Sequence, residues 1–135
     1  MVKTLKIFTD GGARGNPGPA AIGVVIKNNK GEVLKEYAEY LGKTTNNQAE
    51  YRALLKGLEL AKEFKPWEVI CYLDSELVVK QMNQEFKVKD KDLQPLFVQV
   101  WNMAINFKKV SYHHIPRDFN KEADKLLNQE LDKRI

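Results

Sequence analysis

The stretch FTDGGARGNPGPAAIGVVI, residues 8–26, joins an apolar strand to a carboxylate and then to a turn rich in glycine and proline. Residues 2–9 and 20–27 have the apolar composition of strands, and the residues between them have the composition of a turn. Asp10 stands where the first strand is expected to end. A single aspartate at such a place is usually a turn former. Its meaning therefore depends on whether other acids come to the same place.

Two further elements follow from the sequence after this stretch. The segment Asn29-Lys30-Gly31 is typical of a tight hairpin and precedes a third strand, predicted over residues 32–41. From Thr45 the spacing of apolar residues becomes helical, which predicts a helix over residues 45–64. Thr45 is its expected N-cap, and Gln48 three residues later would complete a capping box. Three strands joined by short connections predict an antiparallel meander.

The second half of the chain alternates strands and helices. The short, continuous apolar run WEVICYL, residues 67–73, is typical of a strand that is covered on both faces. The remaining elements are predicted as helices over residues 75–83, 93–107 and 120–135, the last capped by Asn120, and a strand over residues 109–115. A hairpin half followed by a βαβ half indicates an α/β fold, with a five-stranded mixed sheet and about four helices on its faces.

Composition limits the class of protein. The chain has 135 residues, 43% of them hydrophobic and 30% charged, which is ordinary for one globular domain, expected over residues 1–135. The net charge of +4 is compatible with an anionic partner such as nucleic acid. The single cysteine, Cys71, lies in an apolar run and is expected to be buried, which suits a reducing compartment. Because the chain lacks a signal-peptide pattern and a membrane-spanning apolar run, we expect a cytoplasmic protein that does not enter a membrane.

Four acids belong to four different predicted elements. Asp10 and Asp74 each follow an apolar strand, and the carboxyl ends of neighbouring parallel strands form the usual ligand crevice of an α/β sheet. Glu50 and Asp124 lie three or four residues before leucines of the apolar helix stripes, so they are expected to face inward. Each acid alone has an ordinary explanation, as a turn residue, a cap or the partner of an arginine. Together they predict a carboxylate cluster at one edge of the sheet.

A cluster of carboxylates without histidine or cysteine suits a hard, oxygen-preferring cation, Mg²⁺ or Mn²⁺ rather than zinc. Two such ions about 3.5–4 Å apart can activate a water and stabilise the leaving oxygen of a phosphodiester. The four acids are far apart in the sequence, so spacing alone leaves their convergence open.

Four motifs in order make the chain resemble type 1 ribonuclease H (ribonuclease HI) over almost its whole length. They are FTDGGARGNPGPAAIGVVI, TTNNQAEYRALLKGLELA, LDSELVVKQMN and HIPRDFNKEADKLLNQ. The resemblance implies the ribonuclease H-like fold, with strand order 3-2-1-4-5 and an antiparallel second strand. It also implies an endoribonuclease that hydrolyses the RNA strand of RNA–DNA hybrids, leaving 5′-phosphate and 3′-hydroxyl ends.

The resemblance further assigns residues. It makes Asp10, Glu50, Asp74 and Asp124 the catalytic acids that bind two ions of Mg²⁺ or Mn²⁺, completed by the substrate. The positions that match nucleic-acid contacts of the family are Gly11, Gly12, Asn16, Lys43, Thr45, Asn46, Asn47 and Glu76. Glycine permits close approach of a sugar, and asparagine can both donate to and accept from a hydroxyl, the group that marks RNA. As ordinary turn, cap and surface residues, the same positions would need no ligand.

The sequence departs from the family pattern in two places. Arg117 stands where bacterial members often carry a catalytic-loop histidine; an arginine cannot give up a proton at working pH, so its expected role is to orient the scissile phosphate or assist product release. His114 is a second, weaker candidate for that region. The basic protrusion of some members is missing, and the short segment FKVKDKD, residues 86–92, stands in its place. The chain therefore resembles compact archaeal and related short-loop members most.

Two other functions stay open at this stage. One is a nuclease that also cuts duplex RNA, and the other is a catalytically idle module that binds hybrids. The chain is expected to act as a monomer.

Overall fold

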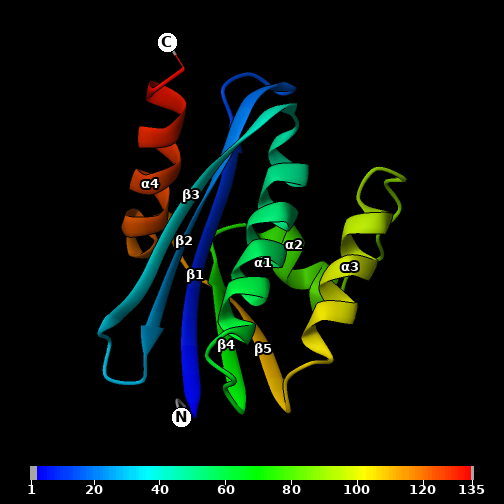
Figure 1. The fold of residues 1–135 in the computed structure, drawn as a ribbon. Helices are drawn as coiled ribbons and strands as arrows, with labels where there is room; N and C mark the ends of the chain where they lie inside the picture. The colour runs from blue at the N-terminus through cyan, green and yellow to red at the C-terminus, as the bar shows by residue number, and fades with distance from the viewer. Residues whose placement is uncertain (1–2, 135) are drawn as a thin grey trace.

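Five strands form one mixed sheet in the computed structural model, which describes residues 3–134 (Figure 1). The strands are β1 (Thr4–Ala13), β2 (Gly18–Asn28), β3 (Val33–Thr44), β4 (Glu68–Leu73) and β5 (Lys109–His114). Their order is β3-β2-β1-β4-β5; β2 is antiparallel to β1 and β3, whereas β1, β4 and β5 run parallel. The expected strand order and direction are confirmed.

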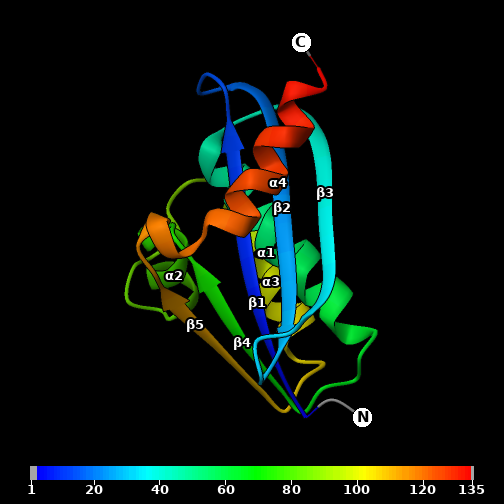
Figure 2. The same cartoon turned by 90° about the vertical axis from the view of Figure 1, so that its left-hand side faces the viewer.

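Within the same residues, four α-helices and one short 3-10 helix flank the sheet. They are α1 (Asn46–Lys62), α2 (Glu76–Met82), α3 (Gln94–Ala104), η1 (Arg117–Phe119) and α4 (Lys121–Asp132). Figures 1 and 2 show α1, α2 and α3 on one side of the sheet and α4 on the other, lying across β1 and β2. The central strand β1 is therefore approached by a helix from each face.

The first strand is longer than the sequence predicts. The expected end at residue 9 is wrong, because β1 continues through Gly11 and Gly12 to Ala13, paired with β2 from Asp10↔Gly23 to Ala13↔Ala20. The parallel ladder with β4 does stop at Thr9↔Leu73. Asp10 thus lies just past the end of the ladder with β4 and inside the ladder with β2. Residues 2 and 135, with which the first strand and the last helix were expected to begin and end, lie outside the described residues.

Both predicted helix caps are present, but their side chains act differently. The Thr45 hydroxyl accepts a hydrogen bond from the Gln48 backbone N–H (3.2 Å), as expected of an N-cap. The capping box is not closed, because the Gln48 side chain pairs with the Thr44 hydroxyl instead. Asn120 occupies the N-cap position of α4, yet its buried side chain donates from Nδ2 to the Thr9 carbonyl (2.9 Å). That contact fastens the start of α4 to β1.

Two glycines let the helices pack closely on the sheet. A Cβ on Gly11 would lie 2.2 Å from the Ala49 carbonyl of α1, and one on Gly23 would lie 2.1 Å from the Ala123 carbonyl of α4. Helices and strands with side chains at these positions would have to move apart. The two glycines therefore determine how near Glu50 and Asp124 come to β1.

The single cysteine is buried, as the sequence predicts. Cys71 is fully buried between the sheet and α1, and burial raises the pKa of its thiol, so it is inert filler. Among residues 3–134, none of the helices is both long enough and apolar enough to cross a bilayer.

Candidate active site

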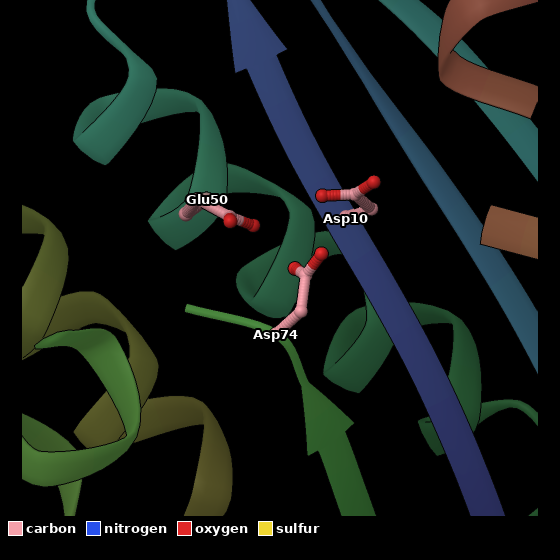
Figure 3. A group of neighbouring side chains, drawn as sticks. All are labelled: Asp10, Glu50 and Asp74. Atoms are coloured by element: carbon pink, nitrogen blue, oxygen red, sulfur yellow. The ribbon is translucent and has the colours of Figure 1, made fainter. Parts of the chain in front are cut away.

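Three carboxylates meet where β1, α1 and the end of β4 come together (Figure 3). Asp10, Glu50 and Asp74 each place an oxygen so that all three atoms lie within 4.8 Å of one another. Figure 3 shows the side chains pointing toward a common space, one from each element. The predicted convergence of these three acids is a feature of the structure.

The backbone explains why the acids meet. Because β1 and β4 are parallel neighbours whose ladder ends at Thr9↔Leu73, the next residue of each strand, Asp10 and Asp74, emerges at the same edge. Glu50 comes from the second turn of α1, and its Oε1 accepts a hydrogen bond from the Gly11 N–H (2.9 Å). This bond fixes the glutamate against the strand that carries Asp10.

Among residues 3–134, the negative charges of the clustered carboxylates are not balanced by nearby positive groups. Burial, and then the charges of Glu50, Asp74 and Asp124, raise the pKa of Asp10 to about 10. Burial and the Asp74 charge raise the pKa of Glu50 to about 8, although the Gly11 N–H and Arg117 oppose the shift. Within the described chain, Asp74 Oδ1 is buried without a hydrogen-bond partner. Such a set of oxygens fits a hard divalent cation, which would supply the missing charge.

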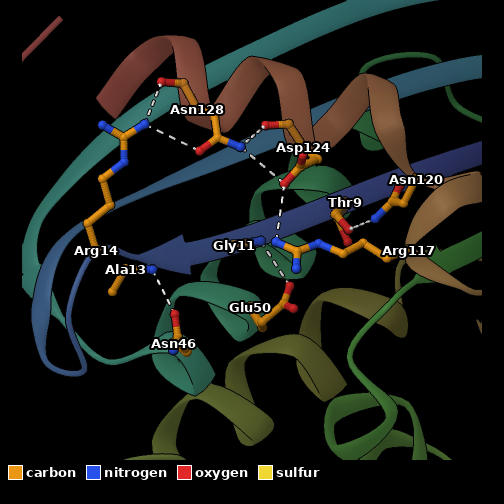
Figure 4. Close-up of polar contacts among 10 residues, drawn as sticks. All are labelled: Thr9, Gly11, Ala13, Arg14, Asn46, Glu50, Arg117, Asn120, Asp124 and Asn128. Carbon is orange, nitrogen blue, oxygen red and sulfur yellow. Dashed lines mark hydrogen bonds and ion pairs between the residues drawn. The ribbon is translucent and has the colours of Figure 1, made fainter. Parts of the chain in front are cut away.

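Asp124 belongs to the same cleft but stands apart from the three-carboxylate cluster. The cleft has a volume of about 500 Å³ and contains all four acids in its lining. Asp124 approaches from α4, on the opposite side of β1 from Glu50 (Figure 4). Its Oδ1 lies 3.2 Å from Asn128 Nδ2, which donates to it, and 3.8 Å from Arg117 Nη2. Asp124 thus faces the cleft, as predicted, and it lies near enough to Asp10 to raise the pKa of that carboxyl.

Arg117 lies at the cleft and the histidines do not. The Arg117 side chain is 79% exposed and lines the cleft beside Asp124. His113 and His114 are both exposed at the end of β5, outside the cleft lining; His113 pairs with the Ser111 hydroxyl (3.0 Å). The structure does not bring the weaker candidate, His114, to the cleft, because β5 ends one strand further from Asp10 than β4 does.

The positions matched to nucleic-acid contacts divide into two groups. Those that line the cleft are Gly11, Gly12 and Asn46. Those outside its lining are Asn16, Lys43, Thr45, Asn47 and Glu76. Two asparagines fasten the β1–β2 turn to α1: Asn46 Oδ1 accepts from Ala13 N (2.8 Å), and Asn16 Oδ1 accepts from Asn46 N (3.0 Å). Lys43 and Asn47 are exposed, and Glu76 pairs with Lys80 (3.4 Å).

Sequence reasoning missed two polar residues of the cleft, Arg14 and Asn128. Asn128 donates from Nδ2 to the Asp124 carbonyl (2.9 Å) as well as to its carboxylate. Only weak signals in the sequence pointed to these residues. Asn128 lies four residues after Asp124 and therefore on the same helix face. Arg14 is the one basic residue of the segment FTDGGARGNPGP.

Comparisons with known proteins agree with this geometry. A family model described as reverse transcriptase-like matches residues 8–130. A bifunctional protein of Mycobacterium tuberculosis is 43% identical over 127 residues, which are 93% of this chain and 35% of that protein. The ribonuclease HI of Halobacterium salinarum is 40% identical over 93% of this chain and 63% of its own length. A ribonuclease H of Chlorobium phaeobacteroides is 32% identical over 97% of both chains. This chain thus spans about a third of the mycobacterial protein.

Solved structures are similar over nearly the whole chain. The crystal structure of ribonuclease H1 from Halobacterium salinarum superposes with a TM-score of 0.94 and 38% identity, over 96% of this chain and 98% of that one. A ribonuclease H1 solved in complex with an RNA/DNA hybrid has a TM-score of 0.93 and 44% identity, again over 96% and 98%.

Proposed function

The chain belongs to the ribonuclease H family, and we propose that it is a divalent-metal-dependent endoribonuclease that hydrolyses the RNA strand of RNA–DNA hybrids. The products would carry 5′-phosphate and 3′-hydroxyl ends. The observation that carries the proposal is the convergence of Asp10, Glu50 and Asp74 within 4.8 Å. Support also comes from a similar ribonuclease H1 that was solved with an RNA/DNA hybrid.

The proposed cofactor is a pair of Mg²⁺ or Mn²⁺ ions. The donor set is all oxygen, and one of those oxygens, Asp74 Oδ1, is buried without a partner among residues 3–134, so the residues present fit a hard cation. Asp10, Glu50 and Asp74 would hold the ions, with Asp124 contributing from α4. Divalent ions at such a site supply an activated water near neutral pH and charge compensation for the departing 3′ oxygen.

The protein's own groups would orient the reaction. The charges of Glu50, Asp74 and Asp124 all act on the Asp10 carboxyl, so Asp10 would hold the ions together with each of the other acids. The Gly11 N–H holds the Glu50 carboxylate in place. Arg117 stays protonated and offers a planar fork of donors, which suits the scissile phosphate or the released product better than proton transfer.

The residues around the acids would select the substrate. Gly11 and Gly12 line the cleft and would present their backbone to a ribose, whose 2′-hydroxyl distinguishes RNA. Asn46 lines the cleft and offers an amide to the sugar or base edge. We propose that five residues act further out along the path of the hybrid: Asn16 in the β1–β2 turn, Lys43 near the end of β3, Thr45 and Asn47 at the start of α1, and Glu76 at the start of α2.

Two wider assignments belong to the same proposal. Residues 1–135 would form a single catalytic domain that acts as a monomer. The cytoplasm is the proposed compartment, because a buried, unpaired Cys71 needs no oxidising environment.

Cleavage of end-labelled duplexes tests the proposal directly. RNA–DNA, RNA–RNA and DNA–DNA duplexes of one sequence are incubated with Mg²⁺ or Mn²⁺ and with wild-type or Asp10→Asn protein. Asp92→Asn, an exposed acid outside the cleft, is the matched control. RNA cleavage that is confined to the hybrid, lost in Asp10→Asn and kept in Asp92→Asn is expected. Additional RNA–RNA cleavage would widen the substrate range, whereas hybrid binding without any cleavage would leave only a binding module.

A further inference from the structure

The catalytic cleft continues past the acids to a second guanidinium. Among the described residues that line it, the cations are Arg14 and Arg117. Figure 4 shows the Arg117 guanidinium beside Gly11, between Asp124 and Glu50, and Arg14 further along, beyond Ala13. A polyanionic strand that crosses the acid cluster would therefore meet Arg117 at the acids and Arg14 beyond them.

Arg14 is held in place by the last turns of α4. Its Nη2 donates to Asp132 Oδ1 (2.6 Å) and lies 3.4 Å from both the carbonyl and the side-chain oxygen of Asn128. A guanidinium carries five N–H donors in a planar fork. All the hydrogen bonds that this side chain makes with residues 3–134 come from one nitrogen, so Nη1 and Nε keep their donors for a ligand. The side chain is 41% exposed.

The ion pair between Arg14 and Asp132 adds too little to the stability of the fold to explain why Arg14 is held at the cleft. Asp132 is 60% exposed, and exposed pairs of this kind contribute about 0–1 kcal/mol. An exposed carboxylate is also easily exchanged for a phosphate, since both accept the same fork of N–H groups. The contact with Asn128 keeps the guanidinium at the cleft when Asp132 is displaced.

The distance along the strand is suitable for a backbone contact. Arg14 directly follows β1, four residues after Asp10, and four residues of a strand span roughly 13 Å. Successive phosphates of one strand are about 3.4 Å apart along a duplex axis, so a span of this size corresponds to a few nucleotides.

We propose that Arg14 binds a backbone phosphate of the hybrid beyond the acid cluster, past the end of β1, and that Asp132 competes with this phosphate for the guanidinium. The inference rests on the proposed function, because it assumes that the cleft receives a hybrid. It makes Arg14 a positioning residue that fixes the strand relative to the acids.

The competing role of Asp132 gives the proposal a distinctive test. If the ion pair were purely structural, Asp132→Asn would change hybrid binding no more than Glu122→Gln, which removes another exposed carboxylate of α4. With a phosphate contact, Arg14→Ala weakens binding, whereas Asp132→Asn tightens it by more than Glu122→Gln does. Arg14→Lys lies between, because lysine keeps the charge and loses the planar fork.

The experiment measures binding of a fluorescent RNA–DNA hybrid without added metal, so that binding is separated from cleavage. Arg14→Ala is expected to weaken binding about tenfold and to reduce the slope of log K against log salt by about 0.9, as for the loss of one phosphate contact. Asp132→Asn is expected to tighten binding about two- to fivefold by removing the competitor. Thermal midpoints of all variants confirm that they are folded.

A second ion pair provides the control. Lys27 Nζ and Glu122 Oε1 are also 2.6 Å apart and also join the sheet to α4, but neither residue lines the cleft. Lys27→Ala and Glu122→Gln are expected to leave the affinity within about twofold of wild type and the salt slope unchanged. An effect of Asp132→Asn no larger than that of Glu122→Gln, or an effect of Arg14→Ala no larger than that of Lys27→Ala, would overturn the proposal.

Neutral methylphosphonate linkages identify the strand that Arg14 contacts. They are placed one at a time along the RNA or the DNA strand, and the linkage that abolishes the difference between wild type and Arg14→Ala marks the phosphate. If no position does so, the contact is not to a phosphate and the proposal fails. Because these measurements need no cleavage, loss of the proposed activity and loss of this contact are distinguished.

Discussion

Asp10 illustrates how one side chain can favour metal binding and oppose folding. Burial of its carboxyl, and then the charges of Glu50, Asp74 and Asp124, raise its pKa from 3.8 to about 10. A raised pKa means that the folded state holds the proton more tightly than the unfolded state. The metal-free protein is therefore expected to lose stability as pH rises from about 4 toward 10.

Asp10→Asn removes this cost, since the amide cannot ionise. We expect the metal-free variant to be more stable than wild type by about 1–3 kcal/mol at pH 8 and nearly equal at pH 4. Urea unfolding in EDTA across this pH range measures the difference. Asp92→Asn, an exposed acid, should show neither effect. A gain that is independent of pH would contradict this origin.

Gly11 and Gly12 are neighbours in sequence with opposite tolerance of a side chain. A Cβ on Gly11 would lie 2.2 Å from backbone atoms of α1, whereas one on Gly12 would meet the Leu127 side chain at 3.6 Å, an ordinary contact. Gly11→Ala is expected to destabilise the protein by about 3 kcal/mol or more, and Gly12→Ala by less than about 1 kcal/mol. Chemical denaturation of the two variants gives the comparison, and equal losses would show that α1 can move.

At the scale of elements, α4 is the helix that brings Asp124 to the other acids. It covers one face of the sheet alone among the described helices and is fastened near its start by Asn120 (Figure 2). Asn120→Ala leaves the buried Thr9 carbonyl without its donor, so we expect a loss of about 1–3 kcal/mol. Glu122→Gln, which breaks only the exposed pair with Lys27, is expected to cost under about 1 kcal/mol. Thermal unfolding of both variants tests this ranking; a larger loss for Glu122→Gln would reverse it.

The elements themselves could be predicted well from sequence, because apolar spacing and turn residues are local signals. The end of β1 could not, since Gly11, Gly12 and Ala13 have the composition of a turn and are extended only by pairing with β2. Composition also failed to distinguish the two uses of Asn120, which could cap α4 or reach β1. The outcome depends on the packing of a helix that is distant in sequence.

In the candidate site too, features set by local sequence could be predicted, and features set by long-range contacts could not. The inward faces of Glu50 and Asp124 follow from helical spacing, and the pairing of Asp10 with Asp74 follows from parallel strand ends. Arg14 was missed because its partners in α4 lie more than a hundred residues away, and an arginine in a turn is commonplace. Residues that lie in a cleft through long-range contacts carry no periodic signal.

At the scale of the whole molecule, the fold concentrates negative charge at one point and relies on a ligand to neutralise it. The sheet places β1 between the hairpin and the βαβ half, α1 and α4 approach it from opposite faces, and each contributes an acid. A native state with three carboxylates within 4.8 Å is expected to bind divalent cations that the unfolded chain does not gather. Cation binding should therefore add to the free energy of unfolding.

We expect Mg²⁺ or Mn²⁺ at about 100 times its dissociation constant to stabilise the wild-type protein by about 2.7 kcal/mol. For a chain of this size, that corresponds to a rise in the thermal midpoint of about 8–15 °C. Na⁺ at equal ionic strength controls for simple screening, and Asp10→Asn should show a much smaller rise because it lacks both the charge and the ligand oxygen. If wild type and Asp10→Asn gained equally, the cations would be acting elsewhere on the surface and the carboxylate cluster would not be the metal site.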